Sequence, residues 1–199
     1  MAAVQVAIID SGGANIASLR FALDRLRAES VLTTDPQLIR NASHVILPGV
    51  GAAADAMSKL RDRRLDTVVP QLTQPVLGIC LGMQLLAEAS QEDDATCLGI
   101  VPVIASRLTG SSRNPVPNMG WCPIRVTRSH PLLDGITTGS YFYFIHSYAL
   151  PPGDFSLATA DHESEMTAVL ARENFYATQF HPERSSTAGA RLLQNFLSI

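Results

Sequence analysis

The sequence predicts an α/β fold: a central, mostly parallel sheet flanked by helices, with antiparallel strands added in the second half. Three observations support this. In the first half, short apolar runs typical of buried strands alternate with stretches of helical periodicity. In the second half, strand-like segments follow one another between turn residues. The chain has 199 residues, of which 46% are hydrophobic and 17% charged, so we expect one globular domain spanning residues 1–199.

The first half is expected to form the parallel part of the sheet. Ile16, Leu19, Leu23 and Leu26 are spaced at three and four residues, which predicts an amphipathic helix. Residues 52–63 are compatible with a helix, and the good helix formers at 81–89 predict another. Apolar runs predict four strands between these helices, at residues 4–9, 30–33, 44–47 and 76–79. Because strands and helices alternate, the strands are expected to run parallel, with helices on both faces.

The second half is expected to extend the sheet with antiparallel strands. Strand-like segments occur at residues 101–104, 124–127, 141–148, 156–161, 166–171 and 175–180. Residues 187–197 carry apolar positions at helical spacing and are expected to close the chain as a helix. The segment at residues 111–115, which contains Ser, Asn and Pro, is the best candidate for a mobile loop.

Composition argues against several classes of protein. The formal net charge is −3 and no long block of Lys or Arg occurs, so neither a nucleic-acid surface nor an anionic-membrane surface is indicated. The three cysteines are widely spaced and form no Cys-x-x-Cys pair, which argues against a disulfide framework and for a reducing compartment. We see no signal peptide and no apolar stretch of about 18 residues, and we therefore expect a cytoplasmic location.

Cys80 is the candidate nucleophile. It is the central residue of the segment 78–82, Gly-Ile-Cys-Leu-Gly, between a predicted strand and a predicted helix, which matches a nucleophile elbow. Such a sharp turn needs glycines because neighbouring backbones approach closely. The N-terminus of the following helix would favour the thiolate. A lone cysteine is more often a small buried apolar residue, and we keep that interpretation for Cys97 and Cys122. The glycine frame favours catalysis at Cys80.

His181 and Glu183 are the candidate base and its orienting carboxylate. His181 comes at the end of a predicted strand, which is where ligands bind in a doubly wound sheet, and Pro182 ends that strand. Glu183 follows two residues later and can hold one imidazole nitrogen while the other faces the thiolate. A lone histidine is more often a satisfied core or surface side chain, and we keep that interpretation for His44, His130 and His162. For His146, a role in lining the pocket and a role in packing both remain open.

Two backbone N–H groups should face the oxyanion that forms when a thiolate attacks an amide. One is expected from Leu81, the residue after the nucleophile. The other is expected from the glycine loop after the third strand, which contains Gly49, Val50 and Gly51. Taken alone, this segment would more simply be an ordinary strand-to-helix turn. Its position after the strand expected beside Cys80 favours the catalytic role.

Together these segments resemble the class I, or triad, glutamine amidotransferase family. Segments in the family's order extend the resemblance over essentially the whole chain, at residues 4–15, 48–51, 78–86, 119–121, 143–148 and 179–185. The resemblance implies a flavodoxin-like fold and a glutaminase that uses Cys80, His181 and Glu183 without a metal or cofactor. Residues 119–121 and 144–148 select the branch of the family that serves a (β/α)8-barrel cyclase, which makes imidazole glycerol phosphate in histidine biosynthesis.

The resemblance also implies roles for individual residues. Glu92 would hold the α-amino group of glutamine and the backbone at Ser147 and Tyr148 would hold the α-carboxylate, in a pocket that also includes Gln84. Ammonia would pass through a channel to the cyclase in a heterodimer, whose contact surface would include Asn15, Met119, Trp121 and Arg184. Hydrolysis without an acceptor would waste glutamine, so we expect the loaded partner to gate the loop at residues 49–51.

The chain departs from the family's pattern outside the triad. Asn118 and Cys122 flank the Met-Gly-Trp segment where His and Asn are usual, which bears on the details of partner contact. Three further departures are Ser11 in place of an aromatic residue, Ala14 in place of glycine and Ala53 in place of Phe.

Two other functions remain open at the level of sequence. The first is a glutaminase that serves another biosynthetic partner, which the Met-Gly-Trp segment argues against and which capture of the barrel cyclase would decide. The second is an inert relative that keeps the fold as a redox sensor or a scaffold. Cys80 alone would suit that role, but His181 and Glu183 would then have no reason to accompany it.

Overall fold

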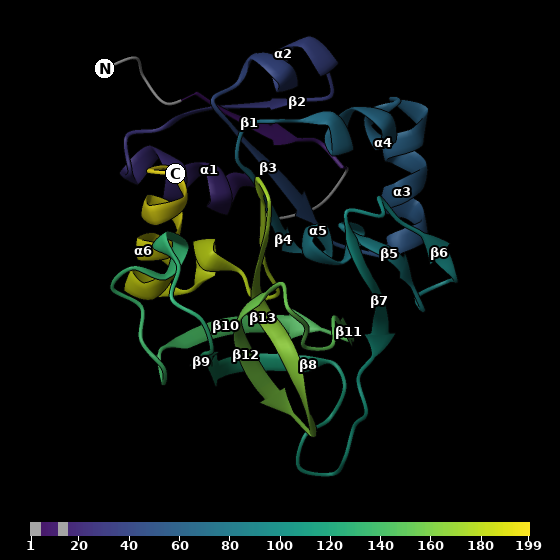
Figure 1. Ribbon diagram of the computed structural model, residues 1–199, viewed down its shortest axis with the longest axis vertical. Coiled ribbons are helices and arrows are strands. Elements are labelled where there is room, and N and C mark those ends of the chain that lie inside the picture. Colours follow the sequence, from purple (N-terminus) through teal and green to yellow (C-terminus); the bar gives the residue numbers. More distant parts are fainter. Residues whose placement is uncertain (1–4, 12–15) are drawn as a thin grey trace.

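The computed structural model describes residues 5–11 and 16–199 (Figure 1). Within these ranges, eight strands form the central sheet in the order β2-β1-β3-β4-β14-β13-β12-β9. Strands β2, β1, β3, β4 and β14 run parallel to one another, and β13, β12 and β9 continue the sheet antiparallel. Their bounds are β1 Gln5–Ile9, β2 Glu29–Thr33, β3 His44–Gly49, β4 Val76–Cys80, β9 Arg125–Val126, β12 Ser156–His162, β13 Ser164–Arg172 and β14 Phe175–Thr178. The predicted fold class, a mostly parallel sheet flanked by helices, is confirmed.

Helices cover both faces of the parallel strands because alternate strand residues point to opposite sides. On β1, Val6 and Ile8 pack into one core with α1 (Ile16–Arg25) and α6 (Ser186–Phe196). Ala7 and Ile9 pack into a second core with α2 (Pro36–Asn41), α3 (Ala53–Asp62) and α4 (Leu65–Val68). Each fully buried Leu or Ile side chain in these cores stabilises the fold by about 1.5–3 kcal/mol. The short 3-10 helix η1 (Val69–Gln71) follows α4.

Two smaller sheets lie beside the central one. The first pairs β8 (Asn118–Pro123) with β10 (Tyr141–His146) in antiparallel register. The second has the order β11-β7-β5-β6, with bounds β5 Ala87–Ser90, β6 Ala95–Thr96, β7 Val101–Arg107 and β11 Tyr148–Ala149. Helix α5 (Leu81–Leu85) and the 3-10 helices η2 (Pro131–Leu133) and η3 (Pro182–Arg184) complete the described elements.

Some predicted elements are wrong in extent or partner. The helix predicted at 81–89 ends at Leu85, because the next segment takes its carbonyls: Leu98 donates to the Leu85 carbonyl and Ile100 to the Leu86 carbonyl. The chain then enters β5 instead of a further helical turn. Strand β14, expected to be antiparallel, is parallel to β4, and the strand predicted at 124–127 shrinks to Arg125–Val126.

Other elements were not predicted at all, among them α2, α4 and strands β6 and β8. The segment expected to be a mobile loop contains two side chains, Ser111 and Asn114, that donate hydrogen bonds to Glu163. Its mobility stays a prediction. Within the part of the chain that the structure describes, no helix combines the length and the apolar character that crossing a membrane requires.

Candidate active site

Cys80 occupies a strained turn between β4 and α5. It is the last residue of β4 and the N-cap of α5, with φ 55° and ψ −109°, a conformation that few non-glycine residues adopt. Glycines permit this turn. A Cβ atom on Gly82 would lie 1.8 Å from the Leu47 carbonyl oxygen, and one on Gly78 would lie 2.8 Å from the Gly82 carbonyl oxygen. The glycine frame therefore lets the elbow pack directly against β3.

His181 and Glu183 come from the turn after β14, the strand that pairs with β4 on the side away from β3. The His181 Nδ1–H donates to Glu183 Oε1 at 2.8 Å, and both side chains are buried. Burial alone would lower the pKa of His181. Hydrogen bonds to the Cys80 and Glu183 side chains, together with their negative charge, outweigh that effect and raise the pKa to about 10. The ring is therefore an imidazolium at neutral pH, beside the nucleophile.

Ser185 fixes the turn that carries the His181–Glu183 pair, and the sequence did not single it out. Its hydroxyl donates to the His181 carbonyl at 2.7 Å and accepts from the Tyr143 N–H at 3.0 Å. The His181 N–H donates to the Tyr143 carbonyl at 2.9 Å. Helix α6 approaches the same turn closely, because a Cβ atom on Gly189 would lie 1.9 Å from the Pro182 carbonyl oxygen.

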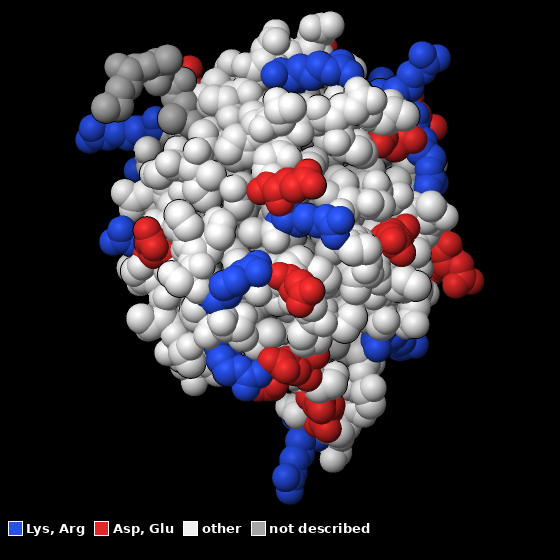
Figure 2. Space-filling model, viewed as in Figure 1, with Lys and Arg blue, Asp and Glu red and all other residues white. Residues whose placement is uncertain are grey.

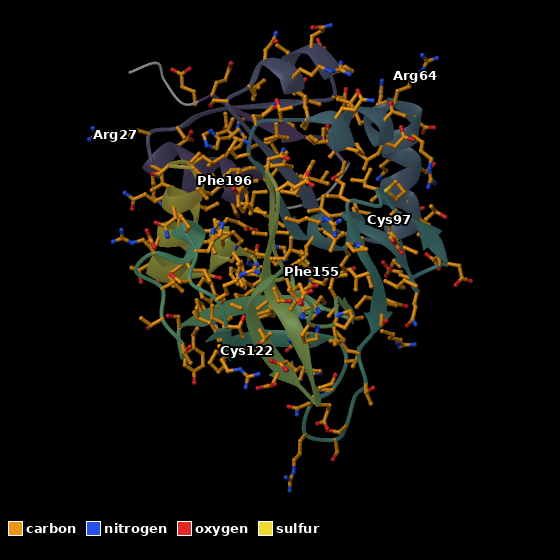
Figure 3. All side chains as sticks on the ribbon, viewed as in Figure 1. Arg27, Arg64, Cys97, Cys122, Phe155 and Phe196 are labelled. Atoms are coloured by element: carbon orange, nitrogen blue, oxygen red, sulfur yellow. The ribbon has the colours of Figure 1, made fainter. Side chains whose placement is uncertain are left out.

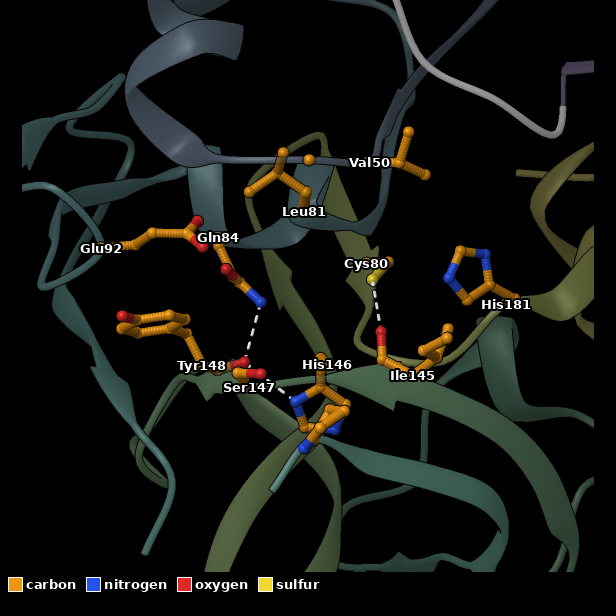
Figure 4. Close-up of a pocket in the computed structure, with 12 residues that line it drawn as sticks. Val50, Cys80, Leu81, Gln84, Glu92, Ile145, His146, Ser147, Tyr148 and His181 are labelled. Atoms are coloured by element: carbon orange, nitrogen blue, oxygen red, sulfur yellow. Dashed lines mark hydrogen bonds between the residues drawn. The ribbon is translucent and has the colours of Figure 1, made fainter. Parts of the chain in front are cut away.

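A cavity of about 300 Å³ opens beside Cys80 and His181 (Figure 4). The predicted residues that line it are Val50, Gly51, Leu81, Gln84, Glu92, Ser147 and Tyr148. Ile145, His146 and Pro117 complete the wall, so the open question about His146 resolves towards lining the pocket. Gly49 and Glu183 do not line this cavity; both border a small void of about 10 Å³ behind His181. The described residues include no group of three or more His, Cys, Asp or Glu arranged to hold a metal ion.

Two buried amides connect the nucleophile to the cavity floor. The Gln84 Nε2 group donates to the Tyr148 carbonyl at 2.8 Å and to Gln179 Oε1 at 3.2 Å. Gln179 Nε2 in turn lies 3.8 Å from Cys80 Sγ and donates to it. Gln179 belongs to one of the segments that carry the family resemblance, but no role was predicted for it. Gln179 is fully buried.

Glu92 joins the cavity to the helix that follows the glycine loop. Its Oε2 atom accepts from the Ala53 N–H at 2.8 Å, at the first residue of α3. This contact fixes the Glu92 side chain on the cavity wall. Cys80 pairs with Gly49 across β3 and β4, which brings the Gly49–Gly51 loop beside the elbow.

The described residues predicted to touch a partner, Met119, Trp121 and Arg184, lie on one exposed surface next to this site. Met119 and Trp121 expose 62% and 51% of their surface. The Arg184 guanidinium lies over the Tyr143 ring at 4.5 Å, and the Trp121 and Tyr143 rings meet edge to face at 6.2 Å. Asn15 lies outside the described residues. Figure 2 shows acidic and basic side chains interspersed over the viewed face, in keeping with the small net charge.

The other cysteines differ from Cys80. Cys97 and Cys122 lie in different parts of the molecule (Figure 3). Burial raises the pKa of Cys97 to about 11, against a smaller lowering by Arg61. Burial also raises the pKa of Cys122, against a hydrogen bond with Asn118 that lowers it. Both side chains therefore stay neutral thiols, and neither lines the cavity.

Comparisons with known proteins agree with this geometry. The family described as "Glutamine amidotransferase class-I" matches residues 7–199. The chain is 49% identical over 194 residues to imidazole glycerol phosphate synthase subunit HisH 2 of Legionella pneumophila, covering 98% of each chain. It is 45% identical over 200 residues to subunit HisH of Vibrio cholerae, again covering 98% of each. The crystal structure of a glutamine amidotransferase from Thermotoga maritima superposes with a TM-score of 0.69 at 15% identity, over 98% of this chain and 96% of the other.

Proposed function

Since the chain belongs to the class-I glutamine amidotransferase family, we propose that it is the glutaminase subunit of an imidazole glycerol phosphate synthase, in histidine biosynthesis. It hydrolyses the side-chain amide of glutamine and passes the ammonia to a cyclase subunit. One observation carries the chemistry: Cys80 and His181, the latter paired with Glu183, line a cavity whose other walls include Glu92, Gln84, Val50 and Gly51. Sequence identity of 49% and 45% to two HisH subunits, over 98% of each chain, supports the assignment to this synthase.

In the first half of the reaction, the Cys80 thiolate attacks the carbonyl carbon of the side-chain amide of glutamine. The carbonyl oxygen becomes an oxyanion, which the Leu81 N–H and an N–H of the Gly49–Gly51 loop stabilise. His181, held as an imidazolium by Cys80 and Glu183, gives its proton to the leaving nitrogen, and ammonia departs. The products of this half are ammonia and a γ-glutamyl thioester on Cys80.

In the second half, the now neutral His181 takes a proton from water, which attacks the thioester carbon. The tetrahedral intermediate collapses, the C–S bond breaks, and glutamate leaves with the thiolate restored. Glu183 keeps the imidazole in one orientation throughout, because its 2.8 Å hydrogen bond fixes the Nδ1–H. No step requires a group from outside the chain except water.

Glutamine is recognised by groups on the far wall of the cavity. The Glu92 carboxylate binds the α-amino group, and it retains Oε1 for this because Oε2 accepts from Ala53. The backbone at Ser147 and Tyr148 binds the α-carboxylate. Gln84 is held by Tyr148 and Gln179, so it forms a preorganised polar side of the pocket.

The partner is a (β/α)8-barrel cyclase that docks on the surface formed by Met119, Trp121, Tyr143 and Arg184. This surface adjoins the triad, because the Tyr143 carbonyl accepts the N–H of His181. Ammonia released into neutral water would be protonated and lose its nucleophilicity, which favours a sealed channel into the partner. The same docking positions the partner to act on the loop at residues 49–51.

The deciding experiment is glutamate release from glutamine, measured for the chain alone and for the chain with the barrel cyclase and its ribonucleotide ligand. We expect weak activity alone and strong stimulation in the loaded complex. Stimulation by a different acceptor enzyme would move the assignment to another amidotransferase. Absence of glutamate release in every mixture would favour an inert relative.

The nucleophile has its own test. Cys80→Ser places a far weaker nucleophile at the elbow, so glutamate release by the loaded complex should fall by about 10³-fold or more. Cys97→Ser is the matched control, because that thiol is neutral and remote from the cavity, and it should change the rate less than twofold. Retained activity in Cys80→Ser protein would overturn the assignment of the nucleophile.

A further inference from the structure

A chain of hydrogen bonds runs under the cavity from the Tyr148 peptide to strand β8. His146 Nδ1 lies 2.9 Å from the Tyr148 carbonyl oxygen (Figure 4). On the other side of the ring, His146 Nε2 lies 3.2 Å from Asn118 Nδ2. Cys122 Sγ donates to Asn118 Oδ1 at 3.6 Å. Asn118 and His146 expose only 4% and 6% of their surface, so these contacts are shielded from water.

The Tyr148 carbonyl determines which group is the donor in each of these hydrogen bonds. A carbonyl oxygen can only accept, so the proton between His146 and Tyr148 must sit on Nδ1. Burial lowers the pKa of His146 to about 4, against a hydrogen bond to Tyr148 that raises it, so the ring is neutral. A neutral imidazole protonated on Nδ1 is an acceptor at Nε2. Asn118 must therefore present its NH₂ group to the ring, which leaves its oxygen for the Cys122 thiol.

The Tyr148 peptide faces the cavity because of its place in the strand register. The Leu108 N–H donates to the Ser147 carbonyl at 2.8 Å, and Tyr148 is the next residue, opposite Arg107 of β7. In an antiparallel pair these positions alternate, so the Tyr148 N–H and carbonyl both point away from β7. The carbonyl is held there by two donors, Gln84 and His146. The N–H on the same side is thereby aimed towards the cavity.

We infer that Asn118 is a positioning residue for glutamine: its amide orients the His146 ring, and the ring fixes the Tyr148 peptide that binds the α-carboxylate. The inference rests on the proposed glutaminase activity and adds to it a residue that never touches the substrate. It also gives a role to Asn118, one of the positions at which this chain departs from the family's pattern. Asn118 and Cys122 lie on the inward face of β8, where Asn118 contacts His146, whereas Met119 and Trp121 face outwards.

The test is steady-state kinetics of the complex with the cyclase and its ligand, for wild type and Asn118→Leu. Leucine has a similar size but cannot donate to His146 Nε2. We expect the KM for L-glutamine to rise about tenfold, with kcat within about twofold, because one ground-state contact is loosened. L-Glutaminamide, which carries an amide in place of the α-carboxylate, should show no such rise. Cys97→Ser, at a thiol that does not line the cavity, is the control and should match wild type.

A double-mutant cycle separates positioning from general damage. In His146→Asn, the new amide nitrogen can take the place of Nδ1 and donate to Tyr148, but it cannot reach Asn118. Adding Asn118→Leu to that background should change the KM less than twofold. A KM for glutamine that Asn118→Leu leaves unchanged, or an equal loss with both substrates, would overturn the inference and leave the glutaminase assignment standing.

The wild-type protein provides a measurement that needs no variant. Nitrogen chemical shifts of His146 should show Nδ1 protonated and Nε2 unprotonated at neutral pH. A ring protonated on Nε2 would overturn the inference even if Asn118→Leu fails to fold. Absence of glutamate release by the wild-type complex would overturn the proposed function, and the inference with it.

Discussion

Two histidines that line the same cavity differ in charge: one is positive and the other is neutral. His181 is an imidazolium because Cys80 and Glu183 raise its pKa to about 10, against burial. His146 is neutral because burial dominates and lowers its pKa to about 4, against the Tyr148 carbonyl. The difference lies in the partners: the Glu183 carboxylate and the Cys80 sulfur for one ring, a carbonyl and an amide for the other. The proposed roles follow from this difference: proton transfer for His181, and holding the Tyr148 backbone in place for His146.

The charge on His181 leads to a pH prediction. In Glu183→Gln the imidazole loses its anionic partner, so its pKa should fall clearly below the value of about 10 in wild type. Nitrogen chemical shifts followed from pH 5 to 11 would measure this. Asp161→Asn, at an exposed carboxylate, is the control and should leave the His181 titration unchanged. Identical titration of His181 in Glu183→Gln and wild type would contradict the assigned cause.

The raised pKa of His181 also makes the stability of the fold depend on pH. The folded pKa of His181 lies above its ordinary value of 6.5, so its pairing stabilises the fold fully below about pH 6.5. That contribution is lost as the pH rises through about 10. The difference in unfolding free energy between wild type and Glu183→Gln should therefore shrink across this window.

At the residue scale, the sequence predicts candidate functional residues where they lie within short motifs. Cys80, His181 and Glu183 were predicted because the glycine frame and the strand end lie within a few residues of them. The contacts that Gln179, Ser185 and Asn118 make in the structure were not predicted. Their partners Cys80, Tyr143 and His146 lie 99, 42 and 28 positions away, and no local pattern records such a contact. The catalytic, oxyanion and substrate roles themselves stay predictions until the variants are measured.

At the scale of elements, the active site is assembled by three adjacent parallel strands. Strand β4 ends at Cys80, its neighbour β3 ends at the Gly49–Gly51 loop, and β14 leads to His181. Since the carboxyl ends of parallel strands meet at one edge, segments far apart in sequence converge there. Gly82 permits α5 to approach β3 closely, because a Cβ atom at this position would collide with the Leu47 carbonyl.

Gly82→Ala should therefore destabilise the protein by about 3 kcal/mol or more, because backbone atoms must move to admit the methyl group. Urea denaturation would measure the loss. Gly99→Ala is the control, because Gly99 has φ +67° but no atom within 4 Å of the added Cβ. It should cost only about 1 kcal/mol, from the backbone conformation alone. Equal losses in the two variants would contradict the packing argument.

The proposed gate belongs to the loop between β3 and α3. Val50→Pro removes a backbone N–H and restricts the loop, so glutamate release by the loaded complex should fall by about 10²-fold, the size of one oxyanion donor. Val50→Ala keeps the N–H and should retain most of the stimulation. If Val50→Pro responds to the loaded partner as wild type does, the loop is not the gate.

Periodicity predicted the parallel core well because those strands and helices bury regular apolar patterns. It failed where a distant segment decides the outcome. The stretch at 81–89 has helical propensity, yet its last turn is replaced by β5 because β6 and β7 provide pairing partners on either side. Strand β8 contains Asn, Gly and Pro, and only its pairing with β10 makes it a strand.

At the scale of the molecule, the cavity and the exposed surface are neighbours. The Trp121–Tyr143–Arg184 group stands on β8, β10 and η3, and η3 also carries Glu183. A partner bound there would rest against the elements that hold the triad. Large exposed apolar side chains next to a reactive centre are typical of an interaction site.

Trp121→Ala should weaken binding of the cyclase about 30-fold, which corresponds to about 2 kcal/mol, because half-exposed aromatic residues often dominate interface energy. Calorimetric titration of the cyclase into the chain would measure it. Leu38→Ala is the control: this side chain is 45% exposed, on α2 at the end of the molecule away from β8 (Figure 1). Its affinity should stay within about twofold of wild type. Equal weakening in the two variants would place the partner elsewhere.

The alternation along β8 has an evolutionary consequence. Asn118 and Cys122 lie on the inward face, with Asn118 against His146, while Met119 and Trp121 face outwards, so under the proposals above neighbouring codons serve two different tasks. Substitutions at single positions can adjust either task without the other. An insertion or deletion of one residue would exchange the two faces of the strand and damage both at once. Lineages of this protein should therefore vary the residues of β8 far more readily than its length.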